Sequence, residues 1–118
     1  MKRWCAMALA AACGVAGAAP SPARPEIDAL LARLQASGCS FNRNGSWHDA
    51  AEARTHLLRK LAYLEDRDLV QTSEQFIARA GTGSSLSGKP YLVRCGGASP
   101  VESKVWLTNE LKALRAGR

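Results

Sequence analysis

The sequence has no long hydrophobic run, no block of like charges and few aromatic residues. Its longest uncharged apolar stretch, Cys5 to Ala16, is well short of the roughly 20 residues that cross a bilayer, which argues against a permanent transmembrane anchor. Aromatic residues make up only 6% of the chain, and Lys and Arg are scattered along it. Nucleic-acid-binding proteins usually gather basic residues on one face or alternate them with stacking aromatics. We therefore expect neither a retained membrane span nor a nucleic-acid partner.

Residues for common redox, metal and catalytic sites are also scarce. A redox-active pair would be C-x-x-C, which is absent, and a structural zinc site needs four ligands. Only His48 and His56 could join Cys39 and Cys95 in such a site. We interpret the two histidines as surface or capping residues, and the alternative is a small hydrolase that pairs one of them with a loop serine. We expect no catalytic set, no cofactor and no metal.

The first 18 residues follow the pattern of a secretory signal peptide. Lys2 and Arg3 precede the alanine-rich stretch 5–16, and Ala16-Gly17-Ala18 fits the small-x-small pattern at which signal peptidase cleaves. We predict cleavage after Ala18. A lipoprotein anchored at Cys13 is the weaker alternative, because the residues before this cysteine match a lipoprotein processing site only loosely.

The chain after the signal peptide matches one small domain. Residues 19–24 belong to a proline-rich stretch that we interpret as a flexible leader, and residues 25–118 can hold a single hydrophobic core. Without Lys2 and Arg3, the number of basic side chains falls from 16 to 14 against 10 acidic ones, which leaves a net charge of +4. We expect a monomer.

Cys39 and Cys95 are the two cysteines that remain after signal cleavage. In an exported protein, an even pair is most simply a disulfide. The bond would close a loop of about 57 residues and stabilise the fold by on the order of 4 kcal/mol. We expect it to fix the exit of loop 81–91 beside a hairpin.

Hydrophobic spacing and capping residues predict an α+β fold of about four helices on a small antiparallel sheet. The helices are expected at 25–37, 50–66, 73–80 and 100–115, and the last three begin with capping pairs. Asn44-Gly45 predicts a tight hairpin, and Tyr91 to Cys95 is the clearest strand. We expect Trp47 to act as a lid on the core.

A glycine-rich segment resembles a phosphate-binding loop in spacing but not in context. Residues 83–89 fit G-x-x-x-x-G-K. A P-loop follows a strand, opens a helix and has Ser or Thr after the lysine. Here a helix is expected before the segment, Pro90 follows Lys89, and a strand comes next. We therefore expect no nucleotide site.

Several short motifs together identify a family resemblance. They are Ser37-Gly38-Cys39, Phe41, Arg43-Asn44-Gly45, Glu52-Ala53, His56-Leu57, Ser84-Ser85, Ser87-Gly88-Lys89-Pro90-Tyr91, Cys95 and Trp106-Leu107. With these motifs the chain resembles the YfeK-like family of small exported bacterial proteins, a domain of unknown function. The resemblance implies a Gram-negative periplasm and transfers no activity.

The leading functional hypothesis is a non-catalytic protein that binds a partner or envelope ligand through loop 81–91 and the hairpin. Polar, glycine-rich loops are common binding elements. The candidate binding residues are Arg43, Asn44, Ser84, Ser85, Ser87, Gly88, Lys89 and Tyr91. An alternative is a lysozyme inhibitor, because Ser87-Gly88-Lys89-Pro90-Tyr91 is similar to the loop that some periplasmic inhibitors insert into the enzyme.

Overall fold

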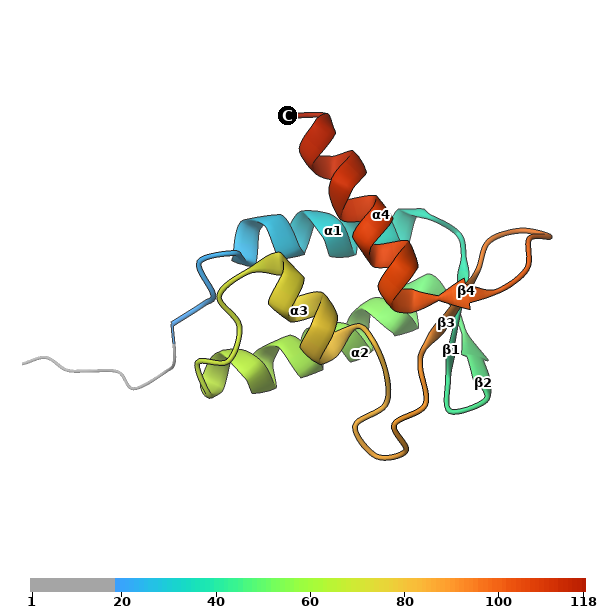
Figure 1. Cartoon of the computed structure of the whole chain (residues 1–118), viewed down its shortest axis with the longest axis horizontal. Coiled ribbons are helices and arrows are strands. Elements are labelled where there is room, and N and C mark those ends of the chain that lie inside the picture. The colour runs from blue at the N-terminus through green and yellow to red at the C-terminus, as the bar shows by residue number, and fades with distance from the viewer. Residues whose placement is uncertain (1–18) are drawn as a thin grey trace, which may run out of the picture.

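The computed structural model describes residues 19–118, which form four helices and a four-stranded antiparallel sheet (Figure 1). The elements in chain order are α1 (Arg24–Ala36), β1 (Ser40–Arg43), β2 (Ser46–His48), α2 (Ala50–Asp66), α3 (Ser73–Ala80), β3 (Leu92–Arg94), β4 (Val101–Glu102) and α4 (Ser103–Ala116). The predicted α+β fold is confirmed, and each predicted helix is present with small shifts of its bounds.

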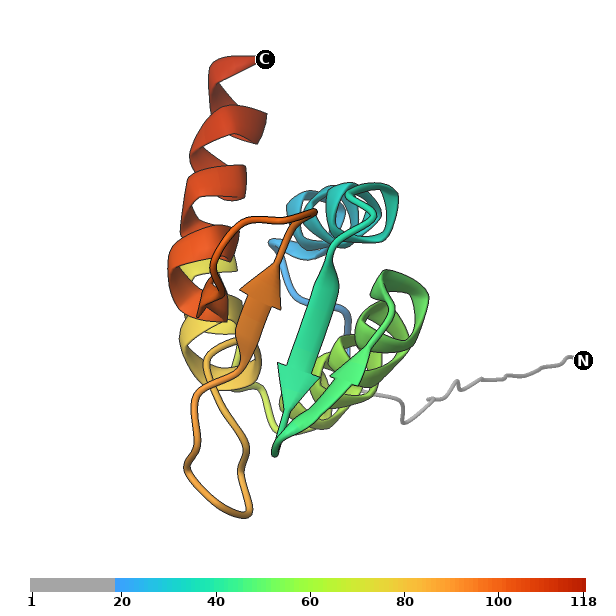
Figure 2. The ribbon, with the colours of Figure 1, turned by 90° about the vertical axis from the view of Figure 1, so that its right-hand side faces the viewer.

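The sheet has the strand order β2-β1-β3-β4, and the helices lie behind one of its faces (Figure 2). Phe41 in β1 pairs with Val93 in β3, and both side chains are buried against the helical layer. The Phe41 ring also meets the Trp106 ring of α4 edge to face, with centroids 5.7 Å apart. Because side chains alternate along a strand, Asn42 and its neighbours Trp47 and Leu92 lie on the other face.

Capping residues set the starts of α2 and α3 as predicted. The Asp49 carboxylate accepts a hydrogen bond from the Glu52 amide at 2.8 Å, and the Glu52 carboxylate accepts one from the Asp49 amide at 3.3 Å. Thr72 caps α3 through the amide of Gln75. These bonds satisfy amide groups that the first helical turn leaves without backbone partners.

One apolar cluster, drawn from all four helices and from β1 and β3, forms the core. In α1, the residues Ile27, Leu30, Leu31 and Leu34 are fully buried at the spacing that predicted this helix. At its end, Gly38 has a φ of +69°, which is the left-handed conformation that glycine adopts without strain. The chain then turns directly into β1.

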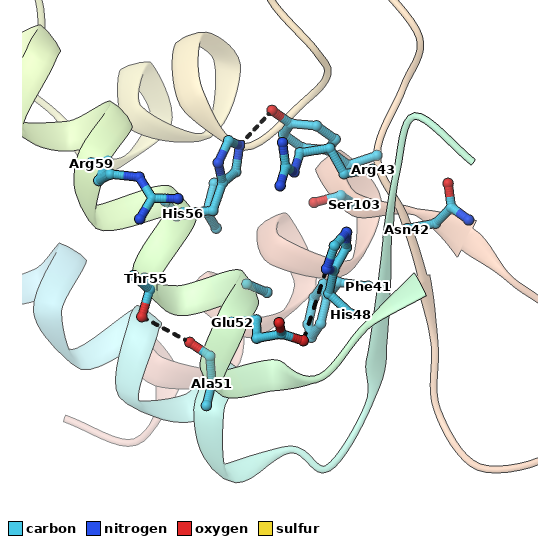
Figure 3. Close-up of a pocket in the computed structure, with 13 residues that line it drawn as sticks. Phe41, Asn42, Arg43, His48, Ala51, Glu52, Thr55, His56, Arg59 and Ser103 are labelled. Carbon is cyan, nitrogen blue, oxygen red and sulfur yellow. Dashed lines mark hydrogen bonds and ion pairs between the residues drawn. The ribbon is translucent and has the colours of Figure 1, made fainter. Parts of the chain in front are cut away.

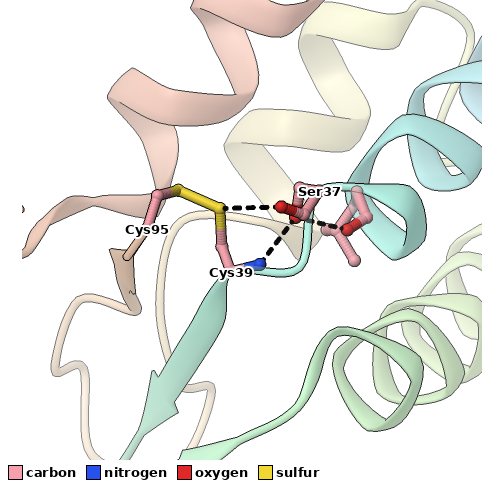
Figure 4. The surroundings of a disulfide bond; sticks show 4 residues. Ser37, Cys39 and Cys95 are labelled. Atoms are coloured by element: carbon pink, nitrogen blue, oxygen red, sulfur yellow. Dashed lines mark hydrogen bonds between the residues drawn. A yellow bond between two sulfur atoms is a disulfide. The ribbon is translucent and has the colours of Figure 1, made fainter. Parts of the chain in front are cut away.

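The predicted disulfide between Cys39 and Cys95 is present, but it does not hold the loop exit (Figure 4). The two cysteines flank the pair Ser40 and Arg94, at the end of β1 and β3 away from the hairpin turn. From Tyr91 at the loop exit to Cys95 the chain runs along β3 for about 13 Å. The expectation that the bond fixes the loop exit is therefore wrong, and strand pairing holds that exit instead.

The start of the last helix and the position of Trp47 also differ from expectation. Val101–Glu102 pairs with β3 as a short strand, so α4 begins at Ser103 and not at Pro100. The Ser103 amide donates to the Tyr91 carbonyl at 2.8 Å, which continues this pairing and competes with an earlier helix start. Trp47 lies on the outer face, where the Arg94 guanidinium stacks 4.0 Å from its ring centroid, so it is not a lid on the core.

The expected signal peptide lies outside the described residues. Within the expected leader, Ser21 is buried, and its amide donates to the Glu65 carboxylate of α2 at 2.8 Å, so the chain is anchored there. None of the helices in residues 19–118 combines the length and the hydrophobicity that a membrane-spanning helix needs.

Candidate functional site

A cavity of about 390 Å³ lies between the β1–β2 hairpin and the first half of α2 (Figure 3). The hairpin contributes Phe41, Arg43 and His48, while α2 contributes residues spaced three or four apart, which places them on one side of the helix. The α2 residues at this cavity include Glu52, Thr55, His56 and Arg59. Both histidines of the chain therefore line the same cavity.

The cavity is closed at one side by a hydrogen-bonded group around Tyr91, the last residue of the loop. Tyr91 is only 6% exposed, and its hydroxyl lies 2.9 Å from His56 Nε2 and 3.0 Å from the Lys60 ammonium. Since an ammonium can only donate, the phenol oxygen accepts from Lys60, and its own proton is available to His56 Nε2. In the arrangement in which the phenol donates to Nε2, the neutral imidazole carries its proton on Nδ1.

The electrostatic surroundings keep His56 neutral. Burial, followed by the positive charges of Arg43, Lys60 and Arg59, lowers the pKa of His56 from 6.5 to about 4. Both causes act in the same direction, because burial and nearby cations each disfavour the imidazolium form. At neutral pH this side chain is a hydrogen-bonding group without charge.

Glu52 is the acidic residue at this cavity, and it is already engaged. Its carboxylate accepts from the Asp49 amide in the capping box of α2 and lies 3.8 Å from His48 Nδ1. Its side chain is also well exposed to solvent. The cavity therefore combines two guanidinium groups with one carboxylate at its solvent-exposed edge.

Loop 82–90 lies beside the hairpin turn and forms a second, separate feature (Figure 2). Its base is closed by an antiparallel bridge between Gly83 and Pro90 and by the Ser84 amide, which donates to the Lys89 carbonyl at 2.9 Å. Asn44 at the hairpin turn donates to the Ser84 hydroxyl at 3.2 Å and accepts from the Ser87 hydroxyl at 2.6 Å. Hydrogen bonds thus join the loop to the hairpin turn.

The structure divides the eight candidate binding residues between these two features. Asn44 and five of the loop residues, namely Ser84, Ser85, Ser87, Gly88 and Lys89, belong to the loop surface. Arg43 and Tyr91 belong to the cavity. The eight residues were expected at one surface because they are close in the sequence, but residues that are adjacent in the chain can point to opposite faces.

The catalytic alternative gains no geometric support. Within residues 19–118, no loop serine is hydrogen-bonded to a histidine, and the hydroxyls of Ser84 and Ser87 are engaged with Asn44. A serine nucleophile needs a base within hydrogen-bond reach. The same range holds no cluster of three or more His, Cys, Asp or Glu side chains that could hold a metal ion.

Arg59 is one of the cavity residues that were not among the candidate binding residues. It follows His56 by three positions on a predicted helix, so helical spacing alone places the two on one face. Helical spacing does not tell which element packs against this face of α2. The sequence does not specify that the inner side of the hairpin packs over this part of α2.

These features define the class of protein. Residues 19–118 form an α+β domain of four helices and four strands, with one disulfide and a basic cavity. The chain belongs to a family of unknown function, DUF5329, whose model matches residues 21–115. A relative from Salmonella typhimurium, the uncharacterized protein YfeK, is 42% identical over 66 residues. That alignment covers 55% of this chain and about half, 53%, of the relative. No solved structure matches.

Proposed function

We propose that this protein is an exported, non-catalytic binding protein of the bacterial periplasm, and that loop 82–90 with the Asn44–Gly45 turn contacts its partner. The observation that carries the proposal is a loop that is ordered from within yet presents a leucine almost entirely to solvent. Leu86 is 96% exposed, more than any other large hydrophobic side chain in residues 19–118.

The order of the loop comes from Ser84. This residue is only 8% exposed, and its hydroxyl accepts hydrogen bonds from the Leu86 and Ser87 amides at 3.2 and 3.3 Å. The Gly88 amide donates to the Ser84 carbonyl at 2.9 Å, and Gly88 has a φ of +75° that a residue with a side chain adopts only under strain. A loop that is already ordered loses less conformational entropy when a partner binds.

The chemistry of the loop tip suits a protein partner with an apolar pocket. Burying a leucine side chain contributes about 1.5–3 kcal/mol. A few buried side chains, surrounded by contacts that exclude water, carry most of the binding energy at many protein interfaces. Lys89, also exposed, adds a positive charge near this anchor.

Affinity capture from periplasmic extract tests the proposal by comparing variants. We expect Leu86→Ala to reduce the recovery of a captured partner about tenfold, which corresponds to the loss of one buried leucine anchor. Leu69→Ala is the matched control, because Leu69 is an exposed leucine, at 42%, outside the loop. Equal recovery by Leu86→Ala, Leu69→Ala and the unchanged protein would contradict the proposal.

A narrower candidate is an inhibitor whose loop enters the cleft of lysozyme. The protruding loop favours this candidate, but Tyr91 is buried and bound to His56 and Lys60, so the contact would be made by Leu86, Ser87 and Lys89. A lysis assay with lysozyme and bacterial cells tests it. We expect the protein to slow lysis and Leu86→Ala to restore it, and an unchanged lysis rate rules this candidate out.

A further inference from the structure

Arg43 and Arg59 are exceptional among the arginines of this protein. The guanidinium group of every other arginine in residues 19–118 contacts a carboxylate, a side-chain amide oxygen, a backbone carbonyl oxygen or an aromatic ring. These arginines are Arg24, Arg33, Arg54, Arg67, Arg79, Arg94, Arg115 and Arg118. In the same range, neither Arg43 nor Arg59 has an ion pair, a hydrogen bond or a ring contact.

These two arginines come from different elements and meet at one cavity. Arg43 ends β1 and Arg59 lies in the third turn of α2, and Figure 3 shows their side chains on opposite sides of His56. Both lower the pKa of this histidine, as expected for positive charges close to the imidazole. The fold therefore gathers positive charge here without supplying a carboxylate to either guanidinium.

We propose that the cavity between the β1–β2 hairpin and α2 binds a small organic anion, whose carboxylate or phosphate group is held by Arg43 and Arg59. Guanidinium groups present pairs of N–H donors that match the two oxygens of a carboxylate or phosphate. Phe41 and Leu57 line the same cavity and contact the apolar part of the ligand. The cavity volume of about 390 Å³ is in the range of pockets that bind small organic molecules.

His56 adds a third group to this site. Its Nε2 is engaged with Tyr91, and in the tautomer that carries the proton on Nδ1 it has one further N–H to donate. As a neutral donor it can bind an anion without bringing another positive charge between the two arginines. The ligand is thus recognised by charge from two sides and by a hydrogen bond between them.

The test is an NMR titration of the purified protein at neutral pH with four probes that share one ring. They are benzoate, phenyl phosphate, neutral benzamide and cationic benzylamine. We expect saturable binding of one or both anions, with shifts at Arg43, Arg59 and His56, and no saturable binding of benzamide or benzylamine. Tighter binding of phenyl phosphate assigns the site to phosphate esters, and tighter binding of benzoate assigns it to carboxylates.

Variants separate this site from adventitious binding. We expect Arg43→Gln and Arg59→Gln each to weaken anion binding about tenfold, since each removes a charged hydrogen-bond donor. Lys104→Gln removes the same charge from an exposed position on α4 and should bind like the unchanged protein. If Arg43→Gln fails to fold, Arg43→Lys keeps the charge, loses the paired donors, and should show an intermediate affinity.

A second measurement follows the proton of His56. A bound anion favours the charged imidazole, so saturating phenyl phosphate should raise the pKa of His56 above its value of about 4. Phenyl phosphate is used because it keeps a negative charge in this acidic range. Equal binding of benzamide and the anions, unchanged affinity in both arginine variants, or no saturable binding of either anion overturns the proposal.

Discussion

Two groups of arginines carry the same charge but differ in their neighbours. Within the described part of the chain, the arginines near Glu26 are paired with carboxylates, and the arginines near His56 are not. Where α1, α3 and α4 meet, Arg115 bridges Glu26 and Glu74 at 2.8 and 2.7 Å. At the hairpin, Arg43 and Arg59 have no such acceptor among residues 19–118. The first group connects helices that are far apart in sequence, and the second is the group that we propose binds an anion.

Glu26 explains why the first group stabilises the fold. Its side chain is 16% exposed and accepts hydrogen bonds from Arg115, Arg118 and the Ser73 hydroxyl, so three elements converge on one carboxylate. The bonds from Arg115 and then Ser73 lower the pKa of Glu26 from 4.5 to about 2. Ionic contacts of this kind hold elements together, whereas Arg43 and Arg59 make no such contact within residues 19–118.

The largest effect on stability is expected from removing the disulfide between Cys39 and Cys95. We expect Cys39→Ala with Cys95→Ala to lower the free energy of unfolding by about 3–4 kcal/mol, because the unfolded chain gains freedom. Urea denaturation measures this change. Since the bond lies at the end of β1 and β3 away from loop 82–90, amide exchange in that loop should change little in the native state. Faster amide exchange across the loop in this variant would mean that the disulfide does help to fix the loop exit.

The next effect concerns Glu26. We expect Glu26→Gln to lower the free energy of unfolding by about 1–2 kcal/mol at pH 7, because charged hydrogen bonds to Arg115 and Arg118 become neutral ones. The lowered pKa means that this contribution is fully present above pH 4.5 and is lost as the pH falls through about 2. Acid titration followed by circular dichroism should show a flatter profile in the variant below pH 4.5.

A smaller effect, and the sharpest contrast, is expected at the cavity. Arg43→Gln and Arg59→Gln should each change the free energy of unfolding by less than about 0.5 kcal/mol, because neither breaks an ion pair. Urea denaturation in buffer without organic anions measures this. A loss of stability as large as that of Glu26→Gln would mean that Arg43 and Arg59 stabilise the fold in the same way as the arginines near Glu26.

The smallest effect is a shift in one titration. The imidazole of His56 should titrate with a midpoint near 4, and Arg43→Gln should raise that midpoint because one lowering charge is removed. Lys104→Gln is the control and should leave it in place. The lowered pKa of His56 also means that stability declines as the pH falls from 6.5 towards 4, since the unfolded chain takes up the proton first.

Much of the fold could be predicted because its signals are local. The Asp49 and Glu52 capping pair, the Asn44-Gly45 turn and the leucine spacing of α1 each specify a short segment by themselves. Ser99 to Glu102 misled the prediction, because a capping pattern in the sequence became a strand once β3 lay beside it. A two-residue strand depends on its neighbour and leaves no local signal.

The cavity was only half predictable for the same reason. Alternation along β1 placed Arg43 on the same face as Phe41, and helical spacing relates His56 to Arg59. Neither pattern indicates that these two faces meet. That contact is a property of the tertiary fold, as is the inward orientation of Tyr91 directly after the exposed residues 85–90.

The closed base of loop 82–90 has a consequence for how this protein can diversify. The Gly83–Pro90 bridge and the hydrogen bond between Ser84 and Lys89 join the two ends of the loop beside each other, and the side chains from Ser85 to Lys89 are outside the core. Substitutions at exposed tip positions such as Ser85 and Leu86 can therefore change the surface of the loop while the domain beneath it stays the same. If the loop binds a partner as proposed, a change of partner would need new side chains at the tip and no new fold.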